Sequence, residues 1–207
     1  MALDAEEREI LVLGMLARAL RVLAEWKPLR VLHLVSADDD LRAVAPRFEL
    51  TINFVRDPQV GLNEALRAGR DAAVAAGATA LLMLPADLPL LEVASLDRLL
   101  DAADAALVAG SGRPVAVIVP ADARAGTNAL LLTPPNVIEP QFGVASFEAH
   151  LRAASEAEAS VQIVDDALLG FDLDTPDDLE RLELSRQLEL QALGEDLVAD
   201  VLFATPS

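Results

Sequence analysis

Three aspartates occupy positions in the chain that suit a divalent cation. Asp87 follows the apolar run 80–85, while Asp172 and Asp174 are two residues apart near the C-terminal end of the chain. If their segment is extended, these two carboxylates point to the same side, and carboxylate oxygens are ligands that Mg²⁺ prefers. The alternative is that Asp87 and Asp174 each cap the helix that follows. The spacing alone leaves both interpretations open.

A glycine-containing loop offers groups that could hold an anion. Gly126, Thr127 and Asn128 stand directly before an apolar run. Backbone N–H groups and a hydroxyl in such a place could cradle a phosphate or a carboxylate. A simple turn uses the same residue types, so the pattern fits either role.

A second loop, over 141–146, contains Gly143 and ends at Ser146, which opens a predicted helix. The N-terminus of a helix is a ready site for an anion, and the alternative is that Ser146 only caps the helix. His150, one turn into the same helix, could donate to a bound anion or could equally be a packed histidine of the helix face. The other histidine, His33, lies in a predicted buried strand and is interpreted as a core residue.

The composition excludes several classes of function. The chain has no cysteine and two histidines, which rules out disulfides and thiolate sites and leaves oxygen ligands for any metal. A formal net charge of −18 disfavours nucleic acid and anionic membranes as partners. Signatures of serine hydrolases, P-loop proteins, dinucleotide enzymes and zincins do not occur in the sequence. The absence of a signal peptide and of a long apolar run predicts a cytoplasmic protein.

Apolar periodicity divides the chain into alternating helices and strands. Asp4 and Glu7 form a capping box at the start of the first predicted helix. The alternation implies one α/β domain over 1–207, with a mainly parallel sheet, helices on both faces and ligands beyond the carboxyl ends of the strands. A partly frayed tail is expected over 195–207. The predicted helices are 4–25, 62–76, 93–103, 146–156 and 176–193, and the predicted strands are 31–36, 50–55, 80–85, 106–109, 115–119, 128–132 and 161–164.

Taken in order along the chain, five motifs resemble the phospholactate and phosphoenolpyruvate guanylyltransferases. The resemblance extends over residues 4–183. Each motif alone is weak, and their order makes the family assignment fairly specific. The motifs are Leu62-Asn63 at a helix start, Leu84-Pro-Ala-Asp87-Leu-Pro89, Gly126-Thr127-Asn128-Ala-Leu-Leu-Leu132, Phe142-Gly143-x-x-Ser146-x-x-x-His150 and Asp172-Leu-Asp174-Thr-Pro-x-Asp-Leu179.

The resemblance implies a three-layer nucleotidyltransferase fold of the nucleotide-diphospho-sugar transferase-like, Rossmann-like kind, with a mixed, mostly parallel sheet. It implies transfer of GMP from GTP to a three-carbon phospho-acid with release of pyrophosphate, in the biosynthesis of coenzyme F(420). The acid stays open among phospholactate, phosphoenolpyruvate and a phosphoglycerate. The residues implied are Asp87, Asp172 and Asp174 for two Mg²⁺ ions, the first two of these as catalytic groups, Asn63 for GTP, and Thr127, Asn128, Gly143, Ser146 and His150 for the acid.

The sequence departs from the family at its start. Family members begin with a strand and a basic nucleotide-binding loop, whereas here the first predicted element is the helix over 4–25. Either the start codon lies further upstream, or nucleotide transfer is lost and the protein binds a phospho-acid without catalysis. A nucleotidyltransferase of the molybdenum cofactor type fits the loops less well. Without that strand, the neighbouring ladders are expected to stay unpaired unless 31–36 moves across, and an exposed edge makes a homodimer attractive.

Overall fold

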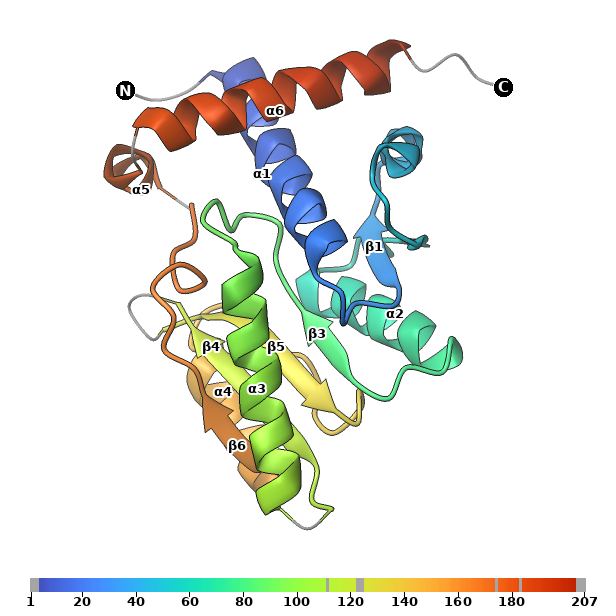
Figure 1. The fold of residues 1–207 in the computed structure, drawn as a ribbon, viewed down its shortest axis with the longest axis vertical. Helices are drawn as coiled ribbons and strands as arrows, with labels where there is room; N and C mark the ends of the chain where they lie inside the picture. Colours follow the sequence, from blue (N-terminus) through green and yellow to red (C-terminus); the bar gives the residue numbers. More distant parts are fainter. Residues whose placement is uncertain (1–3, 111, 122–124, 174, 183, 204–207) are drawn as a thin grey trace.

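The computed structural model describes residues 4–110, 112–121, 125–173, 175–182 and 184–203. Within these ranges the chain forms an α/β fold in which helices flank two sheets (Figure 1). The strands are β1 (Leu32–Ser36), β2 (Ile52–Arg56), β3 (Leu81–Met83), β4 (Val115–Pro120), β5 (Thr127–Thr133) and β6 (Ser160–Ile163). The helices are α1 (Ala5–Glu25), α2 (Leu62–Ala75), α3 (Val93–Ala109), α4 (Ser146–Glu156), α5 (Pro176–Arg181) and α6 (Leu184–Phe203), with the 3-10 helix η1 (Asp39–Arg47).

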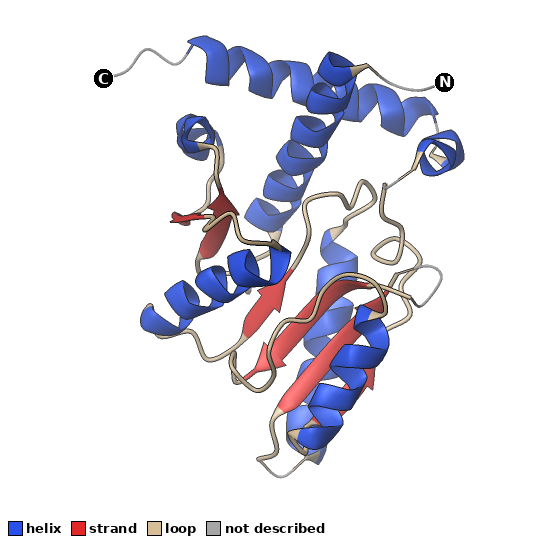
Figure 2. Ribbon diagram, turned by 180° about the vertical axis from the view of Figure 1, so that it is seen from behind, coloured by secondary structure: helices blue, strands red, loops and turns tan. Residues whose placement is uncertain are grey.

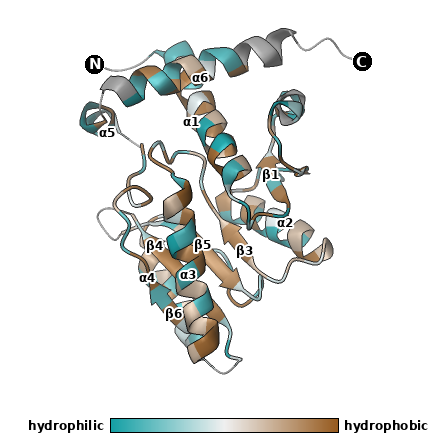
Figure 3. Cartoon of the chain, viewed as in Figure 1, coloured by the Kyte–Doolittle hydropathy of each residue, from teal (hydrophilic) through white to brown (hydrophobic). Residues whose placement is uncertain are grey.

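The larger sheet has the strand order β3-β5-β4-β6 and contains both strand directions. β4 and β6 run parallel, whereas β5 is antiparallel to β3 and to β4. A short loop joins β4 to β5, and so short a connection requires antiparallel strands. Figure 3 shows β3 and β5 as hydrophobic strands, and β4 is buried along its whole length. With β1 and β2 paired in parallel, the expected mixed character is confirmed, in two separate sheets. The sheets are not mostly parallel, because two of the four ladders among the described strands are parallel and two are antiparallel.

Helices α3 and α4 cover opposite faces of the larger sheet, as the two opposite views in Figures 1 and 2 show. Leu96 of α3 joins Val117 of β4 in one buried cluster. Phe147 of α4 joins the next strand residue, Ile118, in another cluster. Because neighbouring residues of a strand point to opposite faces, these clusters form the two sides of one helix–sheet–helix arrangement. The predicted three layers are therefore present.

Helix α2 contacts strands of both sheets, namely β1, β2 and β3. Among the described strands, β1 pairs only with β2, and β3 pairs only with β5. The open ladders predicted from the sequence are thus found, and β1 has not moved across to pair with β3. The two sheets share α2 as a common support without sharing a hydrogen-bonded ladder.

Helices α1 and α6 cross where each carries a glycine. A methyl group on Gly14 would lie 1.9 Å from the carbonyl oxygen of Leu190, and one on Gly194 would lie 1.9 Å from that of Ile10. Glycine is therefore required on both helices for their backbones to approach this closely. At its start, α1 has the predicted capping box between Asp4 and Glu7. Among the described residues, no helix is long and apolar enough to cross a membrane.

Three predicted elements differ in the structure. Residues 106–109 are not a strand but the last turn of α3, because their apolar run continues the buried helix face at Ala103 and Ala106. The single helix predicted over 176–193 is two helices. α5 ends at Arg181, because its C-cap, Leu182, is extended, with φ −76° and ψ 129°. The tail expected over 195–207 is helical as far as Phe203, since α6 packs along α1.

Candidate functional site

The two acidic segments lie side by side. The backbone N–H of Leu173 donates to the backbone carbonyl of Asp87 at 3.2 Å. This bond joins the loop after β3 to the segment that contains Asp172, and the side chains of both aspartates are partly buried. Asp174, the third predicted ligand, lies outside the described residues. The structure therefore brings Asp87 and Asp172 into one region.

The capping alternatives for these aspartates do not hold. The N-cap of α3 is Glu92, five residues beyond Asp87 in the chain. The N-cap of α5 is Thr175, whose side chain forms a capping box with Asp178. The hydrogen bond from Thr175 lowers the pKa of Asp178, so that this aspartate has a structural explanation of its own. Neither helix start explains Asp87 or Asp174.

The donor chemistry of this region fits Mg²⁺. Two carboxylates from neighbouring segments offer hard oxygen ligands, which Mg²⁺ takes one or two at a time beside water and substrate phosphates. Among the described residues, no group of three acidic or histidine side chains forms a complete metal cage. Asp87 and Asp172 thus fit an ion that is shared with a phosphate ligand, and their metal role stays a prediction.

The strand register places Thr127 at the same edge as Asp87. β3 and β5 are antiparallel, with Met83 opposite Leu130. The carboxyl end of β3, which leads to Asp87, therefore lies beside the amino end of β5, which begins at Thr127. This is the edge at which ligands were expected. The loop that contains Gly126, Thr127 and Asn128 lies there beside the segment that contains Asp87.

Asn128 supports the acidic segment from within. Its side-chain amide donates to the carbonyls of Leu169 at 3.1 Å and Gly170 at 3.0 Å, and the side chain is buried. Asp166 holds the same turn by accepting from the N–H groups of Leu168 and Leu169. Burial alone would raise the pKa of Asp166, but the Arg98 guanidinium, 2.9 Å away, and the backbone bonds lower it. The predicted ligand Asn128 is placed as a support of the loop before Asp172.

The first residue of α4, Ser146, is buried and has an unused hydroxyl, whereas residues 143–145 before it are exposed. The N-cap is Ala145, in the left-handed region at φ 59°, and Ser146 is the first helical residue. Ser146 is 1% exposed, and its Oγ has no hydrogen-bond partner among the described residues. The interpretation of Ser146 as an N-cap is therefore wrong. A buried hydroxyl at a helix start, where the helix dipole favours negative charge, suits a phosphate or a carboxylate.

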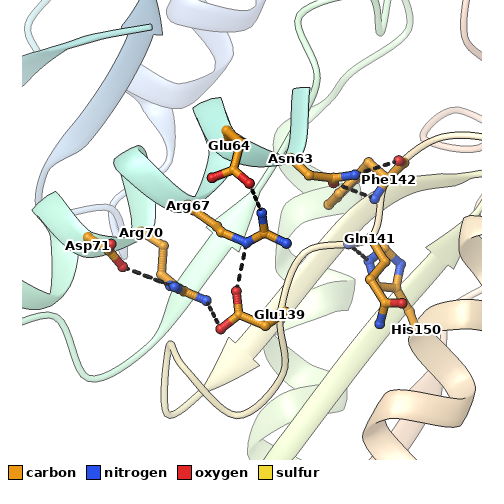
Figure 4. Close-up of polar contacts among 9 residues, drawn as sticks. All are labelled: Asn63, Glu64, Arg67, Arg70, Asp71, Glu139, Gln141, Phe142 and His150. Atoms are coloured by element: carbon orange, nitrogen blue, oxygen red, sulfur yellow. Dashed lines mark hydrogen bonds and ion pairs between the residues drawn. The ribbon is translucent and has the colours of Figure 1, made fainter. Parts of the chain in front are cut away.

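The loop before α4 is tied to α2. The side-chain amide of Asn63 donates to the Phe142 carbonyl at 3.0 Å and accepts from the Phe142 N–H at 2.7 Å. Glu139 in the same loop binds Arg70 at 2.8 Å and Arg67 at 2.9 Å (Figure 4). Asn63, predicted as a GTP ligand, is thus placed where it positions the loop.

His150 lies behind Thr127 and the loop, with a partner at each ring nitrogen. Its Nδ1 is 2.9 Å from the Thr127 hydroxyl, and its Nε2 accepts from the Gln141 N–H at 2.9 Å. Burial lowers its pKa to about 4, so the ring is neutral at pH 7. This geometry favours the packed histidine over a direct donor to the ligand. By contrast, His33 is partly exposed and shares a hydrogen bond with Asn53.

Sequence reasoning missed two parts of this region. A pocket of about 450 Å³ opens between α1, the end of β1 and Ala86, with Leu34 and Ser36 in its lining. The ion pairs of Arg67 and Arg70 with Glu139 join residues about seventy positions apart, which no local spacing could reveal. The positions of Arg67 and Arg70 on one face of α2 were the only local signal for them.

The chain is similar in sequence and in structure to known proteins. The sequence profile of the family described as guanylyl transferase CofC like matches residues 1–187. A phosphoenolpyruvate guanylyltransferase of Rubrobacter xylanophilus is 50% identical over 131 residues, which are 63% of this chain and 60% of that protein. One of the same name from Sphaerobacter thermophilus is 38% identical, over 87% of this chain and 82% of the relative. A 3-phospho-D-glycerate guanylyltransferase of Colwellia psychrerythraea is 31% identical, over 93% of this chain and 87% of that protein.

Solved structures agree on the fold. The 4-diphosphocytidyl-2C-methyl-D-erythritol synthase of Anaerococcus prevotii superimposes with a TM-score of 0.56 at 11% identity, over 82% of this chain and 86% of that chain. A likeness at this identity concerns the fold, which is that of nucleotide-diphospho-sugar transferases and cytidylyltransferases. The profile match, the relatives and the fold lead to one assignment. The chain belongs to the CofC-like guanylyl transferases, a family of nucleotidyltransferase enzymes.

Proposed function

We propose that this protein joins the guanylyl group of GTP to the phosphate of a three-carbon phospho-acid and releases pyrophosphate. Phosphoenolpyruvate is the acid that we place first, because the two relatives at 50% and 38% identity carry its name. The product is an activated three-carbon unit of the kind used in making coenzyme F(420). The observation that supports the proposal is that the start of β5 contacts both neighbouring regions: the Thr127 hydroxyl lies 2.9 Å from His150 of α4, and Asn128 donates to the loop before Asp172.

The reaction joins two anions. A phosphate oxygen of the acid attacks the α-phosphorus of GTP, a new P–O bond forms, and the bond to the β-phosphate oxygen breaks, so that pyrophosphate leaves with the electron pair. The main obstacle is the negative charge that gathers on both reactants. An enzyme for this step must therefore hold the acid firmly and keep the nucleophilic oxygen in line with the leaving group.

The acid is held by the start of α4 and by Thr127. The positive end of the α4 dipole and the Ser146 hydroxyl receive one of its anionic groups, with Gly143 leaving room for close approach. The Thr127 hydroxyl at the head of β5 donates to the same ligand. The pocket between α1 and β1 supplies space at this edge for the nucleotide.

Asp87 and Asp172 would hold Mg²⁺ between the two reactants. The bound ion supplies charge neutralisation for the phosphates at the α-phosphorus. The role of the chain is to keep the two carboxylates adjacent, through the bond from Leu173 to the Asp87 carbonyl and through the support by Asn128. Asp174 is the third predicted ligand.

A panel of acids tests the proposal. Purified protein with GTP and Mg²⁺ is given phosphoenolpyruvate, 2-phospho-L-lactate or 3-phospho-D-glycerate, and pyrophosphate release is followed. We expect release that depends on one acid and is fastest with phosphoenolpyruvate. A folded protein that binds an acid and releases no pyrophosphate with any of them would instead be a binding protein.

A further inference from the structure

We propose that His150 is a positioning residue that turns the hydroxyl proton of Thr127 toward the ligand and fixes the loop 141–146 at the same time. The inference rests on the proposed function for the identity of the ligand, the phospho-acid. His150 itself touches no reacting atom. It acts through two neighbours, one on β5 and one in the loop, and each contact uses a different ring nitrogen.

The tautomer follows from the partners. The backbone N–H of Gln141 can only donate, so the Nε2 of His150, 2.9 Å away, must accept. In a neutral imidazole the proton then resides on Nδ1. Nδ1 therefore donates to the Thr127 hydroxyl oxygen, also at 2.9 Å. A hydroxyl that accepts in this way keeps its own proton for another acceptor.

The ligand is the acceptor that remains. Thr127 is buried, and within the described residues His150 is the one hydrogen-bond partner of its hydroxyl. The proton of this hydroxyl cannot point back at His150, because Nδ1–H occupies that direction. A phosphate or carboxylate oxygen at the sheet edge would accept it. The neutral imidazole thus makes a threonine, which could otherwise donate or accept, into a fixed donor.

The ring environment keeps the imidazole neutral. The side chain is 0% exposed, and a second ring proton on Nε2 would face the Gln141 N–H. Burial lowers the pKa to about 4. The charged groups on the surrounding elements are Glu148, Arg152 and Glu156 on α4 and Glu139 in the loop, the last already paired with two arginines of α2.

His150 also links the two anion-binding groups. Ser146 and His150 are four residues apart and share one face of α4. The ring of Phe142 packs against the imidazole edge-on, with centroids 5.0 Å apart, and its backbone is held by Asn63 (Figure 4). The imidazole ring of His150 therefore links the Thr127 hydroxyl, the loop 141–146 and the start of α4.

Two variants separate the two contacts. His150→Asn can place its amide near Nδ1 and donate to Thr127, whereas His150→Gln can reach only the Gln141 N–H. We expect His150→Gln and Thr127→Val to raise the KM for the phospho-acid about 10-fold or more, since a lost hydrogen bond to an anion has that effect. His150→Asn and Thr127→Ser should retain a KM within about 3-fold of the wild type. The KM for GTP should change little in all four, and His33→Gln is the matched control.

A second readout needs no catalysis. The chain has two histidines, so ¹⁵N spectra assigned with His33→Gln report the state of His150 directly. We expect the Nδ1–H tautomer, neutral from pH 8 down to pH 5. An Nε2–H tautomer, an imidazolium at pH 6, or an unchanged acid KM in a folded His150→Gln variant would overturn the inference. If the wild type releases no pyrophosphate, the proposed function fails, and the ¹⁵N spectra still decide whether the Thr127 proton is free.

Discussion

At the scale of single residues, some buried polar side chains near the sheet edge have hydrogen-bond partners, and one has none among the described residues. The side-chain amide of Asn128 donates to two backbone carbonyls. Both ring nitrogens of His150 are hydrogen-bonded, one to Thr127 and one to Gln141. Ser146 is as buried as these, yet its hydroxyl has no partner among the described residues. A buried unsatisfied hydroxyl costs free energy unless a ligand completes it. Of these side chains, Ser146 is the one whose hydroxyl is available to donate to a bound anion.

This difference predicts opposite effects of Ser146→Ala on stability and on binding. Loss of an unsatisfied hydroxyl should leave the free energy of unfolding unchanged or raise it by about 1 kcal/mol. Loss of a donor to the phospho-acid should raise its KM about 10-fold. Urea unfolding and steady-state kinetics measure the two quantities. A clear loss of stability with an unchanged KM would make the hydroxyl structural.

At the scale of elements, the loop between β5 and α4 is fixed by contacts with α2. Glu139 carries the charged part of this connection, and Asn63 carries the neutral part. The hydrogen bond from Arg70 is the largest influence on Glu139 and lowers its pKa, although burial acts in the opposite direction. The loop that presents Ser146 is thus coupled to a helix that supports both sheets.

Glu139→Gln should destabilise the protein in a pH-dependent way. Because the folded pKa of Glu139 is lowered, its contribution is complete above the ordinary carboxyl pKa and is lost as the pH falls through the lowered value. The side chain is 54% exposed, so we expect a loss of about 1 kcal/mol or less at pH 7 and a smaller loss near pH 3. Urea unfolding at both values tests this, with Glu156→Gln as an exposed control. An equal difference at both pH values would contradict it.

The crossing of α1 and α6 gives a second prediction for the elements. Gly194→Ala would bring a methyl group to 1.9 Å from the Ile10 carbonyl oxygen, so the helices must separate. We expect a loss of about 1–3 kcal/mol and a fall in Tm, despite the better helix propensity of alanine. Gly69→Ala in α2 is a comparison variant for which we expect a smaller loss, because its methyl would meet one side-chain carbon of Val35, at 2.8 Å, rather than backbone. A Gly194→Ala protein as stable as the wild type would mean that α6 does not pack here.

The sequence predicts the elements better than it predicts their long-range contacts. Strong periodicity and the capping box identify α1, and apolar runs identify β4 and β5. The run 106–109 misleads because a buried helix face and a short buried strand look alike locally. The bond from Leu173 to Asp87 joins residues far apart in the chain. Such contacts depend on how the elements pack, which local spacing does not encode.

At the scale of the whole molecule, an acidic protein must bind two anions. The chain has 34 acidic and 16 basic residues, which gives a formal net charge of −18. The overall field therefore repels GTP and the phospho-acid. Local groups must outweigh it, and in the proposed site these would be the hydroxyls of Thr127 and Ser146 at the start of β5 and α4, and a cation held by Asp87 and Asp172.

Removal of Mg²⁺ should therefore weaken binding more than it would in a basic protein. We expect the affinity for phosphoenolpyruvate, measured by calorimetry in the presence of a GTP analogue that cannot release pyrophosphate, to fall by at least about 10-fold when EDTA replaces Mg²⁺. Asp172→Asn should show a much smaller response to Mg²⁺. If the wild type binds phosphoenolpyruvate equally well with and without Mg²⁺, the proposed role of the cation in binding is wrong.

Guanylyl transfer to the acid can be followed through the α-phosphate of GTP. Wild-type protein is incubated with GTP labelled at the α-phosphate, Mg²⁺ and phosphoenolpyruvate, and the products are separated. We expect the label to appear in a compound containing both guanosine and the three-carbon acid, while the released pyrophosphate is unlabelled. Label found only in GTP, or only in GMP or GDP formed by hydrolysis, would contradict guanylyl transfer to the acid.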